Sequence, residues 1–183
     1  MMSPYIKEIN QQLSKNLGIK NSNALPKLTK VVINYRISEG RDSKEVLAAA
    51  EKELMAITGQ KPRLTRSKKS VAAFKLRQGE PLAYKVTLRS TRMYDFINKL
   101  FNLVLPRLRD FKGLPLNSFD QEGNYSLTIH DQTYFSEVNL DAVNKIRSVQ
   151  VTLCISASSI KESKMLLSTL GFPFEKPRTP LGK

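Results

Sequence analysis

The sequence predicts an α+β fold: a mostly antiparallel sheet with helices packed on one face and an open second face. Strand-like and helical segments are interspersed along the chain, without an internal repeat or a low-complexity block. Leu82–Arg89 alternates apolar residues with polar or cationic ones, which is typical of a strand with one buried face. Other segments carry apolar residues at helical spacing and can therefore cover that buried face.

Two helices and a strand are predicted at the N-terminal end. Ser3–Gly18 begins with a Ser-Pro pair, carries apolar residues at helical spacing and ends in glycine, all of which indicate a helix. Leu28–Ile37 is predicted to be a strand because three β-branched residues stand at its centre. A second helix should run to Gly59, since Asp42 and Glu45 resemble the capping box that opens a helix.

The rest of the chain continues the alternation. Arg63–Arg77 is strand-like at both ends and basic in its middle. A helix that begins at Thr91 should stop at Pro106, because proline has no N–H to donate and clashes with the preceding turn. Ser159 and Glu162 have the spacing of another capping box. The remaining patterns predict strands near Tyr125–Ile129 and Val149–Ile155, and a last helix that ends at Gly171.

The charge is strongly positive and unevenly distributed. Lys and Arg number 30 against 16 Asp and Glu among 183 residues, so the formal charge is +14. That much like charge requires a polyanion, either a nucleic acid or an anionic membrane surface. No acidic residue lies between Glu53 and Glu80, whereas a solvated face normally mixes both signs. The clustering favours phosphate contact, and therefore nucleic acid as the partner.

Polar side chains and one aromatic ring interrupt this basic run. Thr65, Ser67 and Ser70 are small donors that can reach phosphates, sugars and 2′-OH groups. Phe74 stands between alanines and Lys75. It is either a core residue of a strand or a stacking ring at the tip of a hairpin, and the sequence leaves both interpretations open.

The opposite pattern follows between residues 120 and 141, where no Lys or Arg occurs. RNA would be repelled by such a surface. The segment therefore either faces solvent, which is the default, or meets a basic protein partner. Its carboxylates are Asp120, Glu122, Asp131, Glu137 and Asp141.

The residues that most enzymes need are missing. A single cysteine, Cys154, forbids an internal disulfide, and its apolar neighbours predict a core position. One histidine, His130, cannot build a zinc site of the usual kinds with it. No phosphate-binding or nucleophile motif occurs, so we expect no enzyme, no cofactor, no metal and no small-molecule substrate. We also expect no signal peptide and no membrane association, since no apolar run approaches the ~20 residues that cross a bilayer.

Several long motifs, in collinear order from about Leu28 to Phe174, resemble one family. The resemblance is to the bacterial large-subunit ribosomal protein that carries 5S rRNA, the fifth in the large-subunit series. The motifs are Thr58–Pro62 (TGQKP), Lys68–Gly79 (KKSVAAFKLRQG), Lys85–Arg89 (KVTLR), Pro106–Leu114 (PRLRDFKGL), Ser118–Asp120 with Gly123–Ser126, and Gly171–Phe174 (GFPF).

The resemblance implies an α+β fold whose open face takes 5S rRNA, with a protruding basic hairpin loop at Lys68–Gln78. It implies one domain over residues 1–174. The basic tail at 175–183 holds two prolines and no apolar pattern, so it is predicted to be extended, and it is longer than in typical family members. The implied partners are 5S rRNA, P-site tRNA, large-subunit rRNA, neighbouring proteins of the central protuberance, and a basic small-subunit head protein across an intersubunit bridge. The location would be a cytoplasmic ribosome or one inside an organelle. The alternatives are an RNA-binding protein or chaperone outside the ribosome, and an RNA-modifying enzyme.

Individual site residues follow from the same resemblance and the neighbouring charges. Family members have a glycine-rich turn after the first-strand Asn, whereas Tyr35–Ser38 stands here, so contacts are expected to be rebuilt around Arg36. The carboxylates of residues 120–141 are assigned to the protein bridge. The 5S rRNA set is Asn34, Arg36, Gln60, Lys61, Arg63, Thr87 and Arg89, and the tRNA set is Lys68, Lys69, Ser70, Phe74, Lys75, Arg77 and Gln78.

Overall fold

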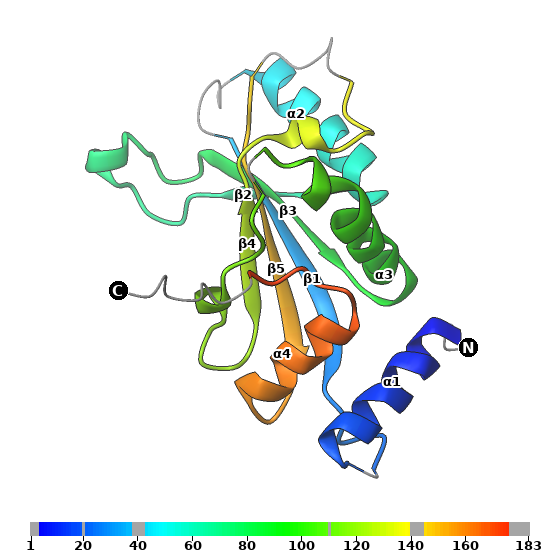
Figure 1. Cartoon of the computed structure of the whole chain (residues 1–183). Helices are drawn as coiled ribbons and strands as arrows, with labels where there is room; N and C mark the ends of the chain where they lie inside the picture. Colours follow the sequence, from blue (N-terminus) through cyan, green and yellow to red (C-terminus); the bar gives the residue numbers. More distant parts are fainter. Residues whose placement is uncertain (1–3, 20, 38–42, 110, 140–144, 176–183) are drawn as a thin grey trace, which may run out of the picture.

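One antiparallel sheet of five strands, in the order β2-β3-β1-β5-β4, organises the computed structural model (Figure 1). The structure describes residues 4–19, 21–37, 43–109, 111–139 and 145–175. The predicted α+β fold is confirmed. The strands are β1 (Lys27–Arg36), β2 (Arg63–Arg66), β3 (Pro81–Leu88), β4 (Tyr125–Ile129) and β5 (Val149–Ser156).

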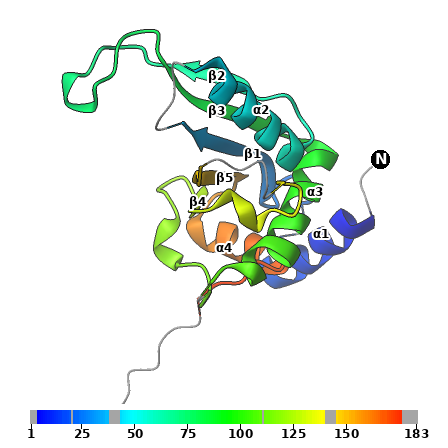
Figure 2. The same cartoon turned by 90° about the horizontal axis from the view of Figure 1, so that it is seen from above.

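In the described part of the chain, the helices cover one face of this sheet (Figures 1 and 2). Their apolar residues and those of alternate strand positions, such as Val31, Val86 and Val151, form one buried core. Figures 1 and 2 show α1 beside α4 at one end of the sheet. The helices are α1 (Pro4–Leu17), α2 (Lys44–Thr58), α3 (Ser90–Lys99) and α4 (Ile160–Thr169).

The other strand positions form the open face. Asn34 and Arg36 alternate with buried neighbours on β1, as Lys85 and Thr87 do on β3. Cys154 also lies at one of these positions of β5, where it is half-buried. The prediction of a core cysteine was therefore wrong: its neighbours Leu153 and Ile155 point into the core, and strand alternation turns Cys154 away from it.

Two predicted elements differ in their extent. Only Arg63–Arg66 forms a strand in the basic segment, and Val71 pairs with Leu76 in an isolated bridge around a 3₁₀ turn. α3 ends at Lys99, and the chain continues through a π-helical turn (Leu100–Val104) and a 3₁₀ turn that contains Pro106. These turns follow from the proline, which cannot supply the N–H that a regular helix needs.

The caps of the helices were partly predicted. Ser159 accepts a hydrogen bond from the Glu162 N–H at 3.4 Å, and the Glu162 carboxylate accepts one from the Ser158 N–H at 2.9 Å. Ser159 is thus the N-cap of α4, as predicted, whereas Glu162 reaches back to the N–H of the residue before the cap instead of that of the cap itself. Asp42, the proposed cap of α2, and Ser3, the proposed start of α1, lie outside the described residues, as does the tail beyond Glu175.

Candidate nucleic-acid interface

The register of the sheet places five polar or cationic side chains in one row across the open face. Asn34 is paired with Lys85 on one side and with Gln150 on the other. Lys85 is in turn paired with Arg63, and Gln150 with Thr128. Paired residues of antiparallel strands point to the same face, and strands lie about 4.8 Å apart, so the row spans roughly 19 Å.

A second row begins with Thr87, which is paired with Val32 of β1. Gln60 lies beside it, because its side-chain amide donates to the Thr87 carbonyl at 3.4 Å. The turn that places Gln60 is well defined: Gly59 ends α2 in the left-handed conformation, with φ 64°, and its N–H donates to the Met55 carbonyl at 2.8 Å. Asn34, Gln60 and Thr87 thus lie on or beside the same face.

The cations of this face are exposed and lack acidic partners. None of the ion pairs among the described residues involves Arg36, Arg63 or Lys85. Arg89 follows β3 directly and is also exposed. Lys61 differs, because its ammonium group lies 3.8 Å from Glu51 of α2 and therefore points toward the helices. Lys61 is therefore the cation of the proposed 5S rRNA set that has an acidic neighbour among the described residues.

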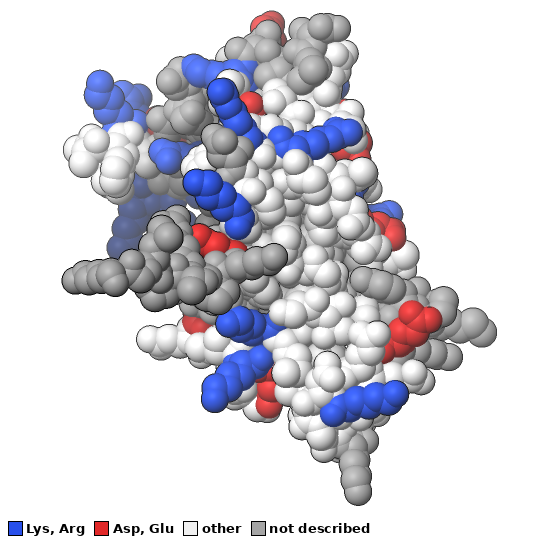
Figure 3. Space-filling model, in the orientation of Figure 1, with Lys and Arg blue, Asp and Glu red and all other residues white. Residues whose placement is uncertain are grey.

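The loop between β2 and β3, residues 67–80, extends beyond the sheet (Figures 1 and 2). Its base is closed by two backbone hydrogen bonds of 2.9 Å between Ser67 and residues 79 and 80. Within the loop, Ser70 Oγ accepts from the Gln78 N–H at 3.0 Å. Figure 3 shows Lys and Arg gathered on and around the loop. Its exposed cations are Lys68, Lys69, Lys75 and Arg77.

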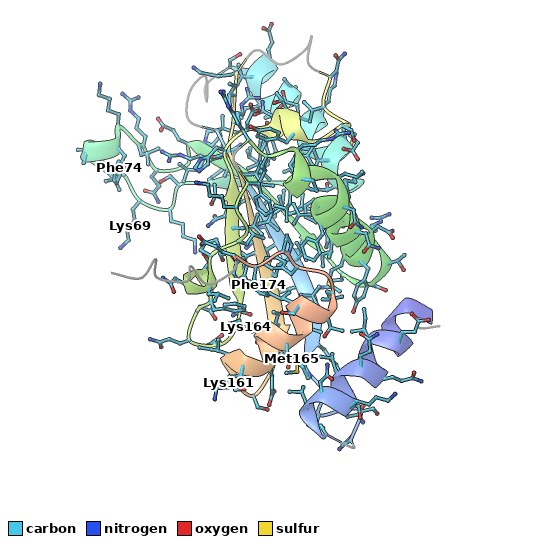
Figure 4. All side chains as sticks on the ribbon, in the orientation of Figure 1. Lys69, Phe74, Lys161, Lys164, Met165 and Phe174 are labelled. Atoms are coloured by element: carbon cyan, nitrogen blue, oxygen red, sulfur yellow. The ribbon has the colours of Figure 1, made fainter. Side chains whose placement is uncertain are left out.

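Phe74 is not a core residue, because 70% of it is exposed. It lies on the projecting loop, as Lys69 does (Figure 4). Together with Asn34, Arg36 and Gln150 it lines a hollow of about 730 Å³. Of the two interpretations that the sequence left open, the structure supports the exposed ring. This ring and residues of the open face line the same hollow.

The carboxylates of residues 120–141 are engaged within the chain more than predicted. Asp120 accepts backbone hydrogen bonds from Glu122 and Asn124, and Asp131 accepts one from Thr133. Glu137 forms an ion pair of 2.6 Å with Lys99. The expectation that this charge is either exposed or met from outside the chain was wrong for Glu137, because α3 brings Lys99 to it. Of the five, Asp120, Glu122 and Glu137 are exposed, Asp131 is half-buried, and Asp141 lies outside the described residues.

Two of these groups have shifted pKa values. Slight burial alone would raise the pKa of Asp120, but hydrogen bonds from Asn124 and nearby backbone N–H groups lower it. Burial likewise opposes ionisation of Glu137, and the hydrogen bond and charge of Lys99 hold its pKa below the usual value. Both carboxylates are therefore held ionised by groups of this chain.

Comparison with known proteins gives the family. The model described as ribosomal protein L5 matches residues 21–77, and the model of the C-terminus of the same ribosomal family matches residues 81–174.

The chain belongs to the ribosomal protein L5 family.

Its relatives include the large ribosomal subunit protein uL5 of Caldanaerobacter subterraneus, which is 47% identical over 172 residues, 94% of this chain and 96% of the relative. The uL5 protein of Geobacter sulfurreducens is 46% identical over 170 residues, 93% of this chain and 95% of that one. As a member of the L5 family, the chain is a ribosomal protein of the large subunit and has ribosomal RNA as a partner. This confirms the resemblance inferred from the motifs. The family is structural, so this chain is not an enzyme.

A buried ion pair in this L5 chain was missed by the sequence analysis. Arg147 donates to both carboxylate oxygens of Glu53, at 3.0 and 3.2 Å, and the Tyr35 hydroxyl donates to the same carboxylate. Burial, followed by the neighbouring Glu53, raises the pKa of Tyr35. Gln132, also buried, accepts from the Arg147 N–H and donates to the Lys145 carbonyl at 2.7 Å. Because Glu53 and Arg147 are 94 residues apart, no local pattern could have paired them.

Neither metal binding nor membrane insertion finds support in the described part of the chain. There, no three His, Cys, Asp or Glu side chains gather as metal ligands. No described helix combines the length and apolar character needed to span a bilayer.

Proposed function

We propose that the open face of the sheet binds 5S rRNA in the central protuberance of the large subunit. The observation that carries this proposal is the row from Arg63 to Thr128, in which two cations without acidic partners among the described residues are followed by two amides and a hydroxyl. Cations neutralise phosphates, and amides and hydroxyls bond to sugars and base edges. Large-subunit rRNA and the neighbouring proteins of the central protuberance complete this environment, in a cytoplasmic ribosome.

The contact groups on the open face can be tested individually. Asn34→Ala, Gln60→Ala and Thr87→Ala should each weaken binding of isolated 5S rRNA by about 1–3 kcal/mol, because an RNA group would lose its partner. Gln12→Ala is the matched control, since Gln12 is an exposed amide on α1. Filter binding at one fixed salt concentration measures the effect. Normal affinity in all three variants would contradict the role of the open face.

The basic loop is proposed to contact P-site tRNA. Its cations project beyond the sheet, and Phe74 offers an exposed ring for a sugar or a base. Replacing Lys68, Lys69 and Arg77 with serine should loosen P-site tRNA and leave 5S rRNA binding unchanged. The same change at Lys15, Lys161 and Lys164, which are exposed elsewhere, removes equal charge. If the loop variant instead loses 5S rRNA and keeps tRNA, this assignment is wrong.

The segment from Asp120 to Asp141 is proposed to face a basic protein of the small-subunit head. Charge attraction suits a contact that slides, because it tolerates shifts that close apolar packing would resist. Asp120, Asp131 and Glu137 also hold their own loops, so Glu122 and Asp141 are the positions to neutralise. E122Q/D141N should weaken subunit association at moderate salt, whereas E8Q/E45Q should not. Equal association of both variants would contradict the bridge.

A further inference from the structure

The contacts proposed above give no role to the hollow of about 730 Å³ between the basic loop and the open face. Its floor is the sheet, where Asn34 and Gln150 are paired neighbours and Thr128 is paired with Gln150. Its wall on the loop side is apolar and is formed by Phe74 and Leu76. Sites for small ligands span roughly 300–1,000 Å³, so the hollow is large enough for one nucleotide.

The tip of the loop fixes the backbone that carries Phe74. Phe74 ends a 3₁₀ turn, and its N–H donates to the Val71 carbonyl at 3.2 Å. Val71 and Leu76 exchange two backbone hydrogen bonds of 3.0 and 3.1 Å, which close the turn. Lys75 adopts the left-handed conformation with φ 48°, which is unfavourable for a residue other than glycine. Because the turn is ordered before a ligand binds, the entropy cost of a contact with the ring is lowered.

The lining matches the two kinds of surface that a nucleic-acid base presents. The exposed ring of Phe74 is flat and apolar, and every base has a face that can stack on such a ring. The amides of Asn34 and Gln150 offer donors and acceptors, which are the groups that read the polar edge of a base. Within the described part of the chain, neither amide side chain has a hydrogen-bond partner of its own. Arg36, on the same floor, can neutralise a phosphate.

We propose that this hollow binds one unpaired nucleotide of 5S rRNA, with its base stacked on Phe74 and the edge of that base on the amides of Asn34 and Gln150. The nucleotide is unpaired because a base within a duplex has its faces covered by neighbouring bases. A peptide is disfavoured, since Arg36 and Lys85, which is paired with Asn34, need anions, and RNA supplies a phosphate with every nucleotide.

The choice of 5S rRNA over tRNA follows from which residues line the hollow. Its floor includes Asn34 and Arg36, which belong to the proposed 5S rRNA set. None of the exposed cations of the loop is among the described residues that line it. This inference rests on the proposed binding of 5S rRNA by the open face. It reassigns the ring of Phe74 to 5S rRNA, while the cations of the loop keep their proposed contact with tRNA.

The test uses three variants of Phe74 in the full-length protein. F74A removes the ring, F74L keeps an apolar side chain without a flat ring, and F74Y keeps the ring. L103A is the control, because Leu103 is also exposed but lies on the π-helical turn after α3 and does not line the hollow. Thermal melting at the temperature of the unchanged protein shows that each variant keeps the fold. Filter binding at fixed salt measures affinity for isolated 5S rRNA, and ribosomes assembled with each variant report the retention of P-site tRNA.

The expected result is a loss of 5S rRNA binding that follows the ring. F74A and F74L should weaken binding by at least about fivefold, the lower end of what one base–ring stack contributes. F74Y and L103A should change it by less than about twofold. The losses in F74A and Q150A should also be non-additive in the double variant, because both side chains hold the same base.

Several outcomes would overturn the inference. Normal 5S rRNA binding by F74A would do so, and release of P-site tRNA by the same variant would assign the ring to tRNA. A loss in F74A that is absent in F74L, or equal in F74Y, would contradict stacking, and additive losses with Q150A would contradict a shared base. Thr87 does not line the hollow, so T87A tests the proposed function separately. If T87A weakens 5S rRNA binding and F74A does not, the open face binds 5S rRNA without a base in the hollow.

Discussion

Replacing Arg147 with methionine should destabilise the protein by about 3–5 kcal/mol, because it leaves a buried carboxylate without its cation. The side chains of Arg147 and Glu53 are only 7% and 12% exposed, so water cannot substitute for the lost partner. Arg147 Nη1 lies 3.0 and 3.2 Å from the two carboxylate oxygens. Methionine retains much of the volume, so the loss of charge pairing should dominate over cavity formation.

An exposed ion pair in the same chain provides the control. Lys61 and Glu51 are 3.8 Å apart, and the side chain of Lys61 is 81% exposed. Lys61→Met should therefore cost less than about 1 kcal/mol, because solvent screens this pair in the folded state. Urea unfolding of both purified variants, followed by circular dichroism, gives the two free energies with the same assay.

The double variant isolates the interaction from other effects of each change. E53Q/R147M should cost clearly less than the sum of E53Q and R147M, because once one partner is gone the other contributes little. A cost for R147M as small as that for K61M would refute the argument from burial. Additive free energies in the cycle would do the same, since they would mean that the two groups act independently.

The remaining predictions concern salt, glycines and pH. Affinity for 5S rRNA should fall steeply with rising salt, and a flat response in filter binding would exclude phosphate contact as its source. Gly113→Ala should lower thermal stability more than Gly79→Ala, because both residues have positive φ but only Gly113 would also clash with backbone. The unchanged protein should be more stable than E137Q above pH 4.5. This difference in the free energy of unfolding, measured with urea, should disappear as the pH falls through the lowered pKa of Glu137. Burial raises the pKa of Tyr35 above 10.0, so the stability linked to its hydroxyl should be lost as pH rises beyond 10.0. Over the same pH range, Y35F should lose less of its free energy of unfolding than the unchanged protein.

Local patterns in the sequence predicted much of the fold. The alternation in Leu82–Arg89 reflects the strand pleat, and Tyr84, Val86 and Leu88 are indeed buried. The extent of the basic strand could not be predicted in the same way. Arg63–Arg66 is a strand because β3 pairs with it, and the pairing ends where the register shifts at Arg66. Pairing partners lie outside the window in which a periodic pattern can be seen.

The candidate site shows the same division between local and distant information. Alternation along β1 and β3 places Asn34 and Thr87 on the open face without any knowledge of their neighbours. That Lys61 has an acidic neighbour follows from where the fold puts Glu51 of α2, and it could not be judged from the motif of Lys61 itself. The environment of Glu137 depended on where α3 brings Lys99. Periodicity gives the direction of a side chain, whereas the sign of the nearest charge is a property of the assembled fold.

These placements give the acids and the cations of this chain different tasks. The described acids that are buried or engaged hold the protein together: Glu53 pairs with Arg147, Glu137 pairs with Lys99, and Glu162 caps α4. The cations of the open face have no such partners among the described residues. Removing an engaged acid should therefore reduce stability first, while removing an open-face cation should reduce RNA affinity with little effect on folding. The cations of the open face thus remain available to a polyanion, because the engaged carboxylates are bound to other groups of the chain.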